Sequence, residues 1–180
     1  MSVEKVLLVI DMLNDFLHPK GKLYCGDSVR NKIIKPSAEL IAWFRNRGYP
    51  VIYVQDAHDE NDPEFKRFPR HAIKNTWGGE FIDEIKPQPG DIIVTKPRFS
   101  ALFQTNLDEI LAKYNPKEIW VIGVCTSICV MDTVVDLRYR DYTVVLPLPC
   151  LGDINPRQHD CALERMDVIF GAKLLWSIPQ

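Results

Sequence analysis

The stretch Val6-Leu-Leu-Val-Ile-Asp11 gives the first indication of the fold, because five consecutive apolar residues end in a carboxylate. A short, continuous apolar run is typical of a strand that is buried on both faces of a parallel sheet. Further runs with strand-like composition follow along the chain, at residues 50–54, 91–95, 118–122, 143–146 and 173–176. We therefore expect six strands.

The segments between these runs carry apolar residues at helical spacing. We predict helices at residues 31–47, 107–114, 128–140 and 156–170, with Gly48 ending the first and Pro156 near the start of the last. Strands that alternate with helices predict a three-layer α/β/α fold around a mostly parallel six-stranded sheet. We expect residues 1–180 to form one domain, with a functional loop or lid at about 56–89.

Composition and charge exclude several classes of protein. The apolar fraction of 46% is ample for a core, and 22 basic against 24 acidic residues give a net charge of −2. This balance argues against a broadly basic nucleic-acid binder and against attraction to anionic membranes. With no run of 18 apolar residues and no signal-peptide cleavage site, we expect a cytoplasmic protein that does not enter the membrane and keeps most of its five cysteines reduced.

Reactive side chains follow four of the predicted strands. Asp11 follows the first strand, Asp56 and His58 the second, Lys96 the third, and the segment ending in Cys129 the fourth. An aspartate after a strand is by itself an ordinary turn residue. Ligands of open α/β sheets bind outside the carboxyl ends of the strands, so the four positions together predict a functional site.

Cys129 is the candidate nucleophile. At the start of a helix and near Lys96, its thiol is expected to have a lowered pKa. Asp11 could accept the thiol proton and return it to a leaving amine. Cys125 is the rival thiol, but its backbone N–H, with that of Cys129, could instead form an oxyanion hole. A metal site on Cys125 and Cys129 is a weaker alternative, since no second thiol pair has zinc spacing.

The loop that follows the second strand holds a second cluster of polar residues. Its carboxylates and histidines, which suit a divalent metal such as zinc with open coordination positions, are Asp56, His58, Glu64 and His71. A single loop histidine is usually solvated rather than ligated. Four such residues within 16 positions, beside the reactive strand ends, leave the metal site and the solvated loop evenly balanced.

Four groups of residues occur in a recognisable order and spacing along the whole chain. They are Val9-Ile-Asp11-Met-Leu-Asn-Asp15-Phe16 with Gly21-Lys-Leu23; Asp56-Ala-His58 with Pro63-Glu64 and Phe68-Pro-Arg-His71; Lys96 with Phe99-Ser-Ala and Thr105-Asn-Leu107; and Gly123-Val-Cys-Thr-Ser-Ile-Cys129-Val with Thr133 and Asp136. In this arrangement the chain resembles the isochorismatase-like cysteine hydrolases and, among them, the nicotinamidases.

The resemblance implies a function and a set of site residues. It implies an Asp11, Lys96 and Cys129 triad, a cis peptide at Val124–Cys125 before the oxyanion-hole residue, and hydrolysis of nicotinamide to nicotinate and ammonia through a thioester. It also implies a divalent metal, with Zn²⁺ as the first candidate, that holds the pyridine nitrogen of the substrate. The metal ligands implied are Asp56, His58 and His71, with Glu64 as a fourth in some members; the pocket aromatics are Phe16, Phe68 and Phe103; and the assembly is a homo-oligomer.

Three departures from the family pattern leave alternatives open. Gln104 stands where the family often has glycine and Leu102 where it often has an aromatic residue; Cys125 stands where many members have Ala, Val or another small residue; and His18-Pro-Lys-Gly21 replaces the usual Pro-Gly-Gly. Gln104 and Leu102 put the shape of the pocket in question. A hydrolase of another small amide or of a ureido acid, as in the carbamoyl-sarcosine amidases, and a non-catalytic relative of the fold therefore remain as other hypotheses.

Overall fold

A parallel sheet of seven strands runs through residues 2–180, the part of the chain that the computed structural model describes. The strands are β1 (Lys5–Ile10), β2 (Val51–Asp56), β3 (Ile92–Lys96), β4 (Glu118–Val124), β5 (Val144–Pro147), β6 (Leu151–Gly152) and β7 (Lys173–Leu175). Their spatial order is β3-β2-β1-β4-β5-β7, and β6 pairs with the end of β4.

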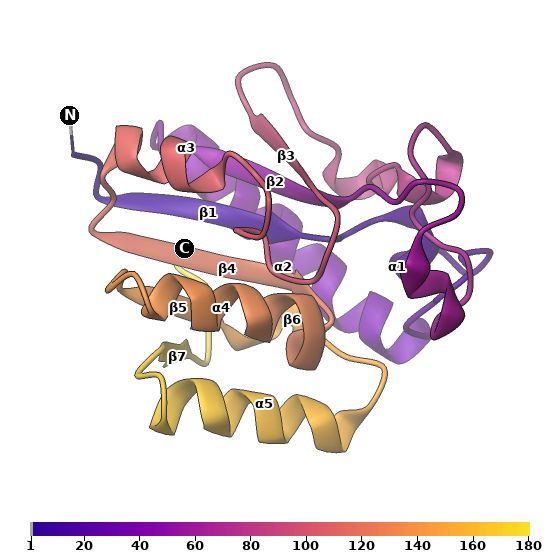
Figure 1. Cartoon of the computed structure of the whole chain (residues 1–180). Helices are drawn as coiled ribbons and strands as arrows, with labels where there is room; N and C mark the ends of the chain where they lie inside the picture. The colour runs from indigo at the N-terminus through magenta and orange to yellow at the C-terminus, as the bar shows by residue number, and fades with distance from the viewer. Residues whose placement is uncertain (1) are drawn as a thin grey trace.

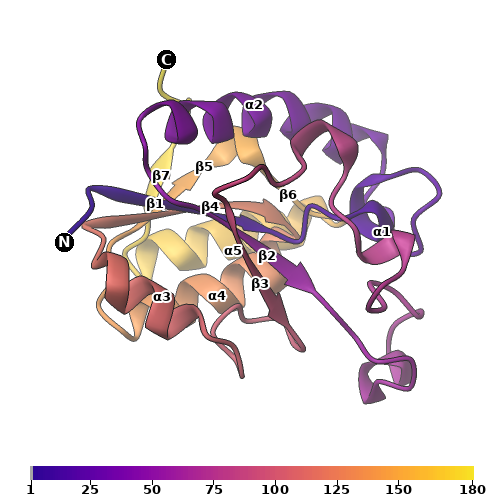
Figure 2. The ribbon, with the colours of Figure 1, turned by 90° about the horizontal axis from the view of Figure 1, so that it is seen from above.

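Helices cover both faces of this sheet. They are α1 (Asn14–Leu17), α2 (Asp27–Asn46), α3 (Leu107–Tyr114), α4 (Met131–Arg138) and α5 (Pro156–Val168). Figure 2 shows α2 above one face of the sheet and α3, α4 and α5 below the other, which confirms the three-layer α/β/α fold. No helix among residues 2–180 is both long and apolar enough to cross a membrane.

The predicted number of strands was wrong by one. The additional strand, β6, is two residues long and pairs Leu151 with Gly123 and Gly152 with Val124. A strand of only two residues is too short to appear as an apolar run in the sequence. The other strands lie within a residue or two of the predicted ranges.

The first strand shows why the apolar runs are continuous. Val6, Leu8 and Ile10 belong to the core on the α3–α5 side, whereas Leu7 and Val9 belong to the core on the α2 side. Successive side chains of a strand point to opposite faces, so a strand covered on both faces needs apolar residues at every position. All five of these side chains are fully buried.

The first part of the long segment between β2 and β3 lies beyond the carboxyl ends of the strands (Figure 1), where it is tied to the first helix of the chain, and the rest returns past α2 to the start of β3. The buried carboxylate of Asp15 accepts hydrogen bonds from the backbone N–H of Ala72 at 2.8 Å and of Lys22 at 3.0 Å. Gly78 packs so closely on the same carboxylate that an added Cβ would lie 2.1 Å from an oxygen of Asp15. Asp15 therefore holds the segment against the start of the chain.

Gly123 is required where β4 passes β1. Its φ is +125°, and a Cβ there would lie 1.9 Å from the carbonyl oxygen of Ile10. We expect Gly123→Ala to lower the free energy of unfolding by backbone strain of about 1–3 kcal/mol and by overpacking of a similar size. Gly90→Ala is the matched control, because Gly90 also has a positive φ, +103°, but has open space around the Cβ position. In urea unfolding, Gly123→Ala should cost at least about 2 kcal/mol more than Gly90→Ala; equal losses would show that strain alone matters.

Candidate active site

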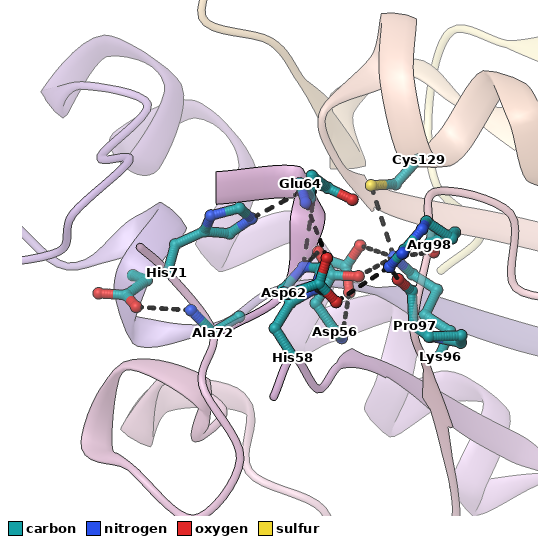
Figure 3. Close-up of polar contacts among 12 residues, drawn as sticks. Asp56, His58, Asp62, Glu64, His71, Ala72, Lys96, Pro97, Arg98 and Cys129 are labelled. Carbon is teal, nitrogen blue, oxygen red and sulfur yellow. Dashed lines mark hydrogen bonds and ion pairs between the residues drawn. The ribbon is translucent and has the colours of Figure 1, made fainter. Parts of the chain in front are cut away.

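Three parallel strands and the turn after a fourth place four reactive side chains at one edge of the sheet. Lys96 lies at the centre: its Nζ is 2.8 Å from Asp11 Oδ2 and 3.5 Å from Cys129 Sγ, and it forms an ion pair with Asp56. Figure 3 shows Lys96 reaching toward both Asp56 and Cys129. The backbone carbonyl of Arg98 accepts a further hydrogen bond from Lys96 at 3.1 Å.

This cluster of charges is buried. Asp11 is fully buried, Lys96 is 1% exposed and Asp56 is 3% exposed. Although burial opposes it, attraction to Asp11 and Asp56 raises the pKa of Lys96 well above its usual value. Asp11 also accepts a hydrogen bond from the backbone N–H of Asp56 at 2.8 Å. The ammonium group therefore compensates two carboxylates that could not both stay charged without it.

The thiol of Cys129 does not have the lowered pKa that we expected from the sequence. Burial raises its pKa well above the usual value, and the charges of Asp11 and Asp56 add to this effect, whereas Lys96 opposes it. Burial, helped by the nearby charge of Asp56, also raises the pKa of Asp11 to about 6. The resting thiol is therefore neutral, and its sulfur lies within 4.8 Å of a carboxylate oxygen of Asp11. A carboxylate with a raised pKa therefore lies beside the thiol.

Cys129 lies in a single π-helical turn, Thr126–Val130, between β4 and α4. The carbonyl of Cys125 accepts hydrogen bonds from the N–H groups of Ile128 and Val130. The buried hydroxyl of Thr126 donates to the carbonyl of Gly152 at 3.0 Å. The Val124–Cys125 peptide is cis, as the resemblance implied. The turn thus fixes the backbone at both cysteines that we predicted for the site.

The predicted metal ligands come together beside this cluster. Donor atoms of Asp56, His58 and His71 all lie within 4.8 Å of one another, and all three residues are buried. Glu64 completes the group, with its Oε1 3.9 Å from the Nε2 atoms of both His58 and His71.

The histidine rings are oriented for a cation. His71 Nδ1 lies 2.7 Å from the carbonyl of Pro69, and His58 Nδ1 lies 3.2 Å from Asp62 Oδ2. Each Nδ1 faces a hydrogen-bond acceptor, which leaves each Nε2 as the nitrogen that could bind a cation. The buried Nε2 of His58 has no hydrogen-bond partner among the described residues. Metal-binding histidines in proteins typically have such an outer partner, so these residues fit a divalent metal.

A cavity opens above the cysteine turn and the metal-ligand group, and it is lined by residues of both. Of the predicted pocket residues, Phe16 and Phe68 line it and Phe103 does not; Phe103 is 46% exposed elsewhere. The lining residues that sequence analysis did not select for the pocket are Leu23, Phe99, Val124, Ile128 and Ile154.

The two unusual residues after Lys96 do not reach the cavity. Gln104 has a φ of +54°, which explains why a glycine suits this position. Leu102 is 6% exposed and packs in the core on the α3–α5 side. The shape of the pocket depends instead on Phe99, three residues after Lys96.

Sequence analysis also missed two charged residues that hold the site together. Asp62 contacts His58 and accepts a hydrogen bond from the N–H of Glu64, and Arg98 donates to Asp62 at 3.0 Å. The sequence Asp62-Pro63-Glu64 did carry a signal, because aspartate followed by proline is typical of the start of a helical turn. Arg98 has no such signal.

Comparison with known proteins places the chain among hydrolases of one fold. The model of the isochorismatase domain matches residues 5–176. The structure is similar to nicotinamidase/pyrazinamidase PncA from Bacillus subtilis, with 30% identity, a TM-score of 0.90, and 96% of this chain and 99% of that one covered. It is similar to N-carbamoylsarcosine amidase from Thermoplasma acidophilum, with 34% identity, a TM-score of 0.85, and 96% and 95% covered.

A third similar structure contains a metal. It is the pyrazinamidase from Pyrococcus horikoshii in complex with zinc, with 30% identity, a TM-score of 0.88, and 96% of this chain and 98% of that one covered. The two kinds of amidase match this chain about equally well.

We predict that the purified protein binds one divalent metal ion through the metal-ligand group of Asp56, His58, His71 and Glu64. His58→Ala and His71→Ala should each weaken Zn²⁺ binding at least about 100-fold, because each removes a ligand rather than an outer partner. His18→Ala is the control, since this ring packs on Trp77 away from the group. Titration of metal-free protein with Zn²⁺ by calorimetry measures the affinities. Unchanged binding in His58→Ala would overturn the assignment.

Proposed function

The chain belongs to the isochorismatase family of hydrolases, and we propose that it converts nicotinamide to nicotinate and ammonia. One observation carries the proposal: a buried lysine contacts both a carboxylate and a thiol beneath a cavity, and a metal-ligand group lies at the side of that cavity. The first part supplies the chemistry of amide hydrolysis. The second part supplies a means of holding a pyridine ring.

The reaction follows from the positions of Asp11, Lys96 and Cys129. Asp11 takes the proton of the Cys129 thiol as the sulfur attacks the amide carbon. The ammonium of Lys96 offsets the negative charge that forms on the sulfur, and the N–H groups of Cys125 and Cys129 hold the amide oxygen as it becomes negative. Asp11 then gives its proton to the departing nitrogen, which leaves as ammonia, while the carbonyl carbon stays bound to sulfur as a thioester.

The second half of the reaction uses the same residues. Asp11 takes a proton from a water molecule, the oxygen of which attacks the thioester carbon, and the proton returns to the sulfur of Cys129. One amide and one water thus become one carboxylic acid and one ammonia. The raised pKa values of Cys129 and Asp11 suit this proton shuttle, because neither group is locked in its charged form.

The metal-ligand group and the aromatic side chains account for the choice of ring. A divalent cation, with Zn²⁺ as the first candidate, held by Asp56, His58 and His71 with Glu64 beside them, would supply a Lewis acid for the ring nitrogen of the substrate. Phe16 and Phe68 provide flat apolar walls for the ring. Phe16 also packs edge-on against His71, with 5.5 Å between the ring centres, so the wall and the metal-ligand group support each other.

The charge of the cavity lining favours a neutral amide. Its lining includes the carboxylates of Asp56 and Glu64 but no lysine or arginine. Lys96 lies below the lining, where it is paired with Asp11 and Asp56. A ureido acid such as N-carbamoylsarcosine brings a carboxylate of its own, for which the lining offers no basic side chain, so only the cation held by Asp56, His58 and His71 could pair with it. Nicotinamide has no charge to neutralise.

The nucleophile can be tested with the two cysteines of the cavity. Cys129→Ala should lower ammonia release from nicotinamide at least about 100-fold, because it removes the attacking sulfur. Cys125→Ala should stay within about threefold of wild type, because only the backbone of Cys125 takes part. Coupled measurement of ammonia gives both rates. The assignment fails if Cys129→Ala keeps its activity or if Cys125→Ala loses it equally.

The substrate can be tested with a pair of amides. We expect kcat/KM for nicotinamide to exceed that for N-carbamoylsarcosine at least about 100-fold, since the cavity lining offers a substrate carboxylate no lysine or arginine to pair with. Removal of the metal with a chelator should lower turnover of nicotinamide, and added Zn²⁺ should restore it. Turnover of N-carbamoylsarcosine at the higher rate, unaffected by the chelator, would favour a ureido acid amidase instead.

A further inference from the structure

The carboxylate of Asp62 lies where three segments of the site meet. Its Oδ2 is 3.2 Å from His58 Nδ1 and accepts a hydrogen bond from Arg98 Nη1 at 3.0 Å. Its Oδ1 accepts a hydrogen bond from the backbone N–H of Glu64 at 2.9 Å. The side chain is 9% exposed, although the backbone belongs to a surface loop. These three contacts fix the position of the Asp62 carboxylate.

The contact with His58 determines which ring nitrogen is free. A carboxylate only accepts hydrogen bonds, so the contact with Asp62 keeps a proton on Nδ1 of His58 and leaves Nε2 as the nitrogen that could bind a cation. That Nε2 lies 3.7 Å from Asp56 Oδ2 and 3.9 Å from Glu64 Oε1, at the centre of the metal-ligand group. With the proton on Nε2 instead, His58 could not bind a cation there.

The contact with Glu64 sets the position of a second member of the group. Asp62 caps the short 3-10 helix Pro63–Lys66, whose second residue is Glu64. Capping of this kind fixes the first turn of a helix relative to the residue before it. One side chain thus orients the ring of His58 and places the backbone of Glu64.

Arg98 connects Asp62 to the catalytic lysine. The guanidinium group pairs with Asp62, while the backbone carbonyl of Arg98 accepts a hydrogen bond from Lys96 at 3.1 Å. Figure 3 shows Arg98 and Asp62 between His58 and Lys96. The Asp62–Arg98 ion pair therefore joins the loop after β2 to the loop after β3. Asp62 contacts His58 on one side, and the backbone of Arg98 contacts Lys96 on the other.

We propose that Asp62 is a positioning residue for the metal site: its carboxylate holds His58 with Nε2 free and Glu64 in reach of the same ion. The proposal rests on the metal site of the proposed function. It assigns Asp62 to the outer layer of that site, although Asp62, His58 and Glu64 also have donor atoms close enough to form a ligand group of their own.

Asp62→Ser separates the cap on Glu64 from the contacts with His58 and Arg98, because a serine hydroxyl caps a helical turn well but is too short to reach either side chain. We expect Asp62→Ser to keep the thermal stability of the metal-free protein and to weaken Zn²⁺ binding about 10–100-fold. Asp62→Ala should weaken it at least as much. Asp59→Ala is the matched control from the same loop, since Asp59 is 80% exposed and pairs with Lys74; its Zn²⁺ affinity should not change.

The protonation of His58 gives a second readout that a purely structural role would not move. At a pH at which the ring of His58 is neutral, nitrogen NMR shifts of metal-free wild-type protein should show His58 protonated on Nδ1, and in Asp62→Ser the Nε2-protonated form should appear. With Zn²⁺ bound, Nε2 should be the metal-bound nitrogen. Wild-type Zn²⁺ affinity in Asp62→Ser overturns the proposal, and so does a metal-bound Nδ1, which would make Asp62 part of the ligand group.

This experiment also separates failure of the proposal from failure of the proposed function. If wild-type protein binds no Zn²⁺, the metal site of the proposed function fails, and the role of Asp62 in metal affinity fails with it. The tautomer of metal-free His58 still tests the contact with Asp62 by itself. If Zn²⁺ binds but nicotinamide is not hydrolysed, the function fails while the role of Asp62 stands.

Discussion

The buried ammonium of Lys96 is the interaction on which the rest of the site depends. It compensates Asp11 and Asp56 and lies beside the sulfur of Cys129, so it holds together groups that would otherwise repel or desolvate one another. Asp56 faces Lys96 on one side and the histidines on the other. The residues that we propose for proton transfer and those that we propose as metal ligands therefore both contact Asp56, and a change to either set affects the charge balance of the other.

The parallel sheet makes this arrangement possible. Asp11 follows β1, and Asp56 and Lys96 end β2 and β3, which are neighbours in the sheet. Parallel strands bring their carboxyl ends to the same edge, so residues 40 to 45 positions apart in the sequence come within hydrogen-bond distance. The loops then add what the strands cannot supply. The turn after β4 presents Cys129, and the segment after β2 presents the histidines.

Much of the fold and part of the site could be predicted from the sequence. The continuous apolar runs predict strands covered on both faces, and residue types at strand ends predict which side chains meet. The two-residue β6 left no pattern, and the predicted pKa of Cys129 was wrong because burial depends on the whole fold rather than on neighbours in sequence. Phe103 and Phe99 are four residues apart in one loop, and nothing in their sequence positions shows that Phe99 rather than Phe103 lines the cavity.

The carboxylate of Asp15 has a consequence for how this enzyme could acquire a new specificity. It receives the N–H of Ala72, next to a metal-ligand histidine, and leaves no room for a side chain at position 78. The segment from Ala72 to Gly78 therefore cannot be replaced by an unrelated loop sequence. A transplanted loop would need a residue other than proline at position 72 and a glycine at position 78, whereas residues 59–61 at the exposed tip carry neither requirement. Substitutions that change specificity are therefore easier to accommodate at residues 59–61 than near positions 72 and 78.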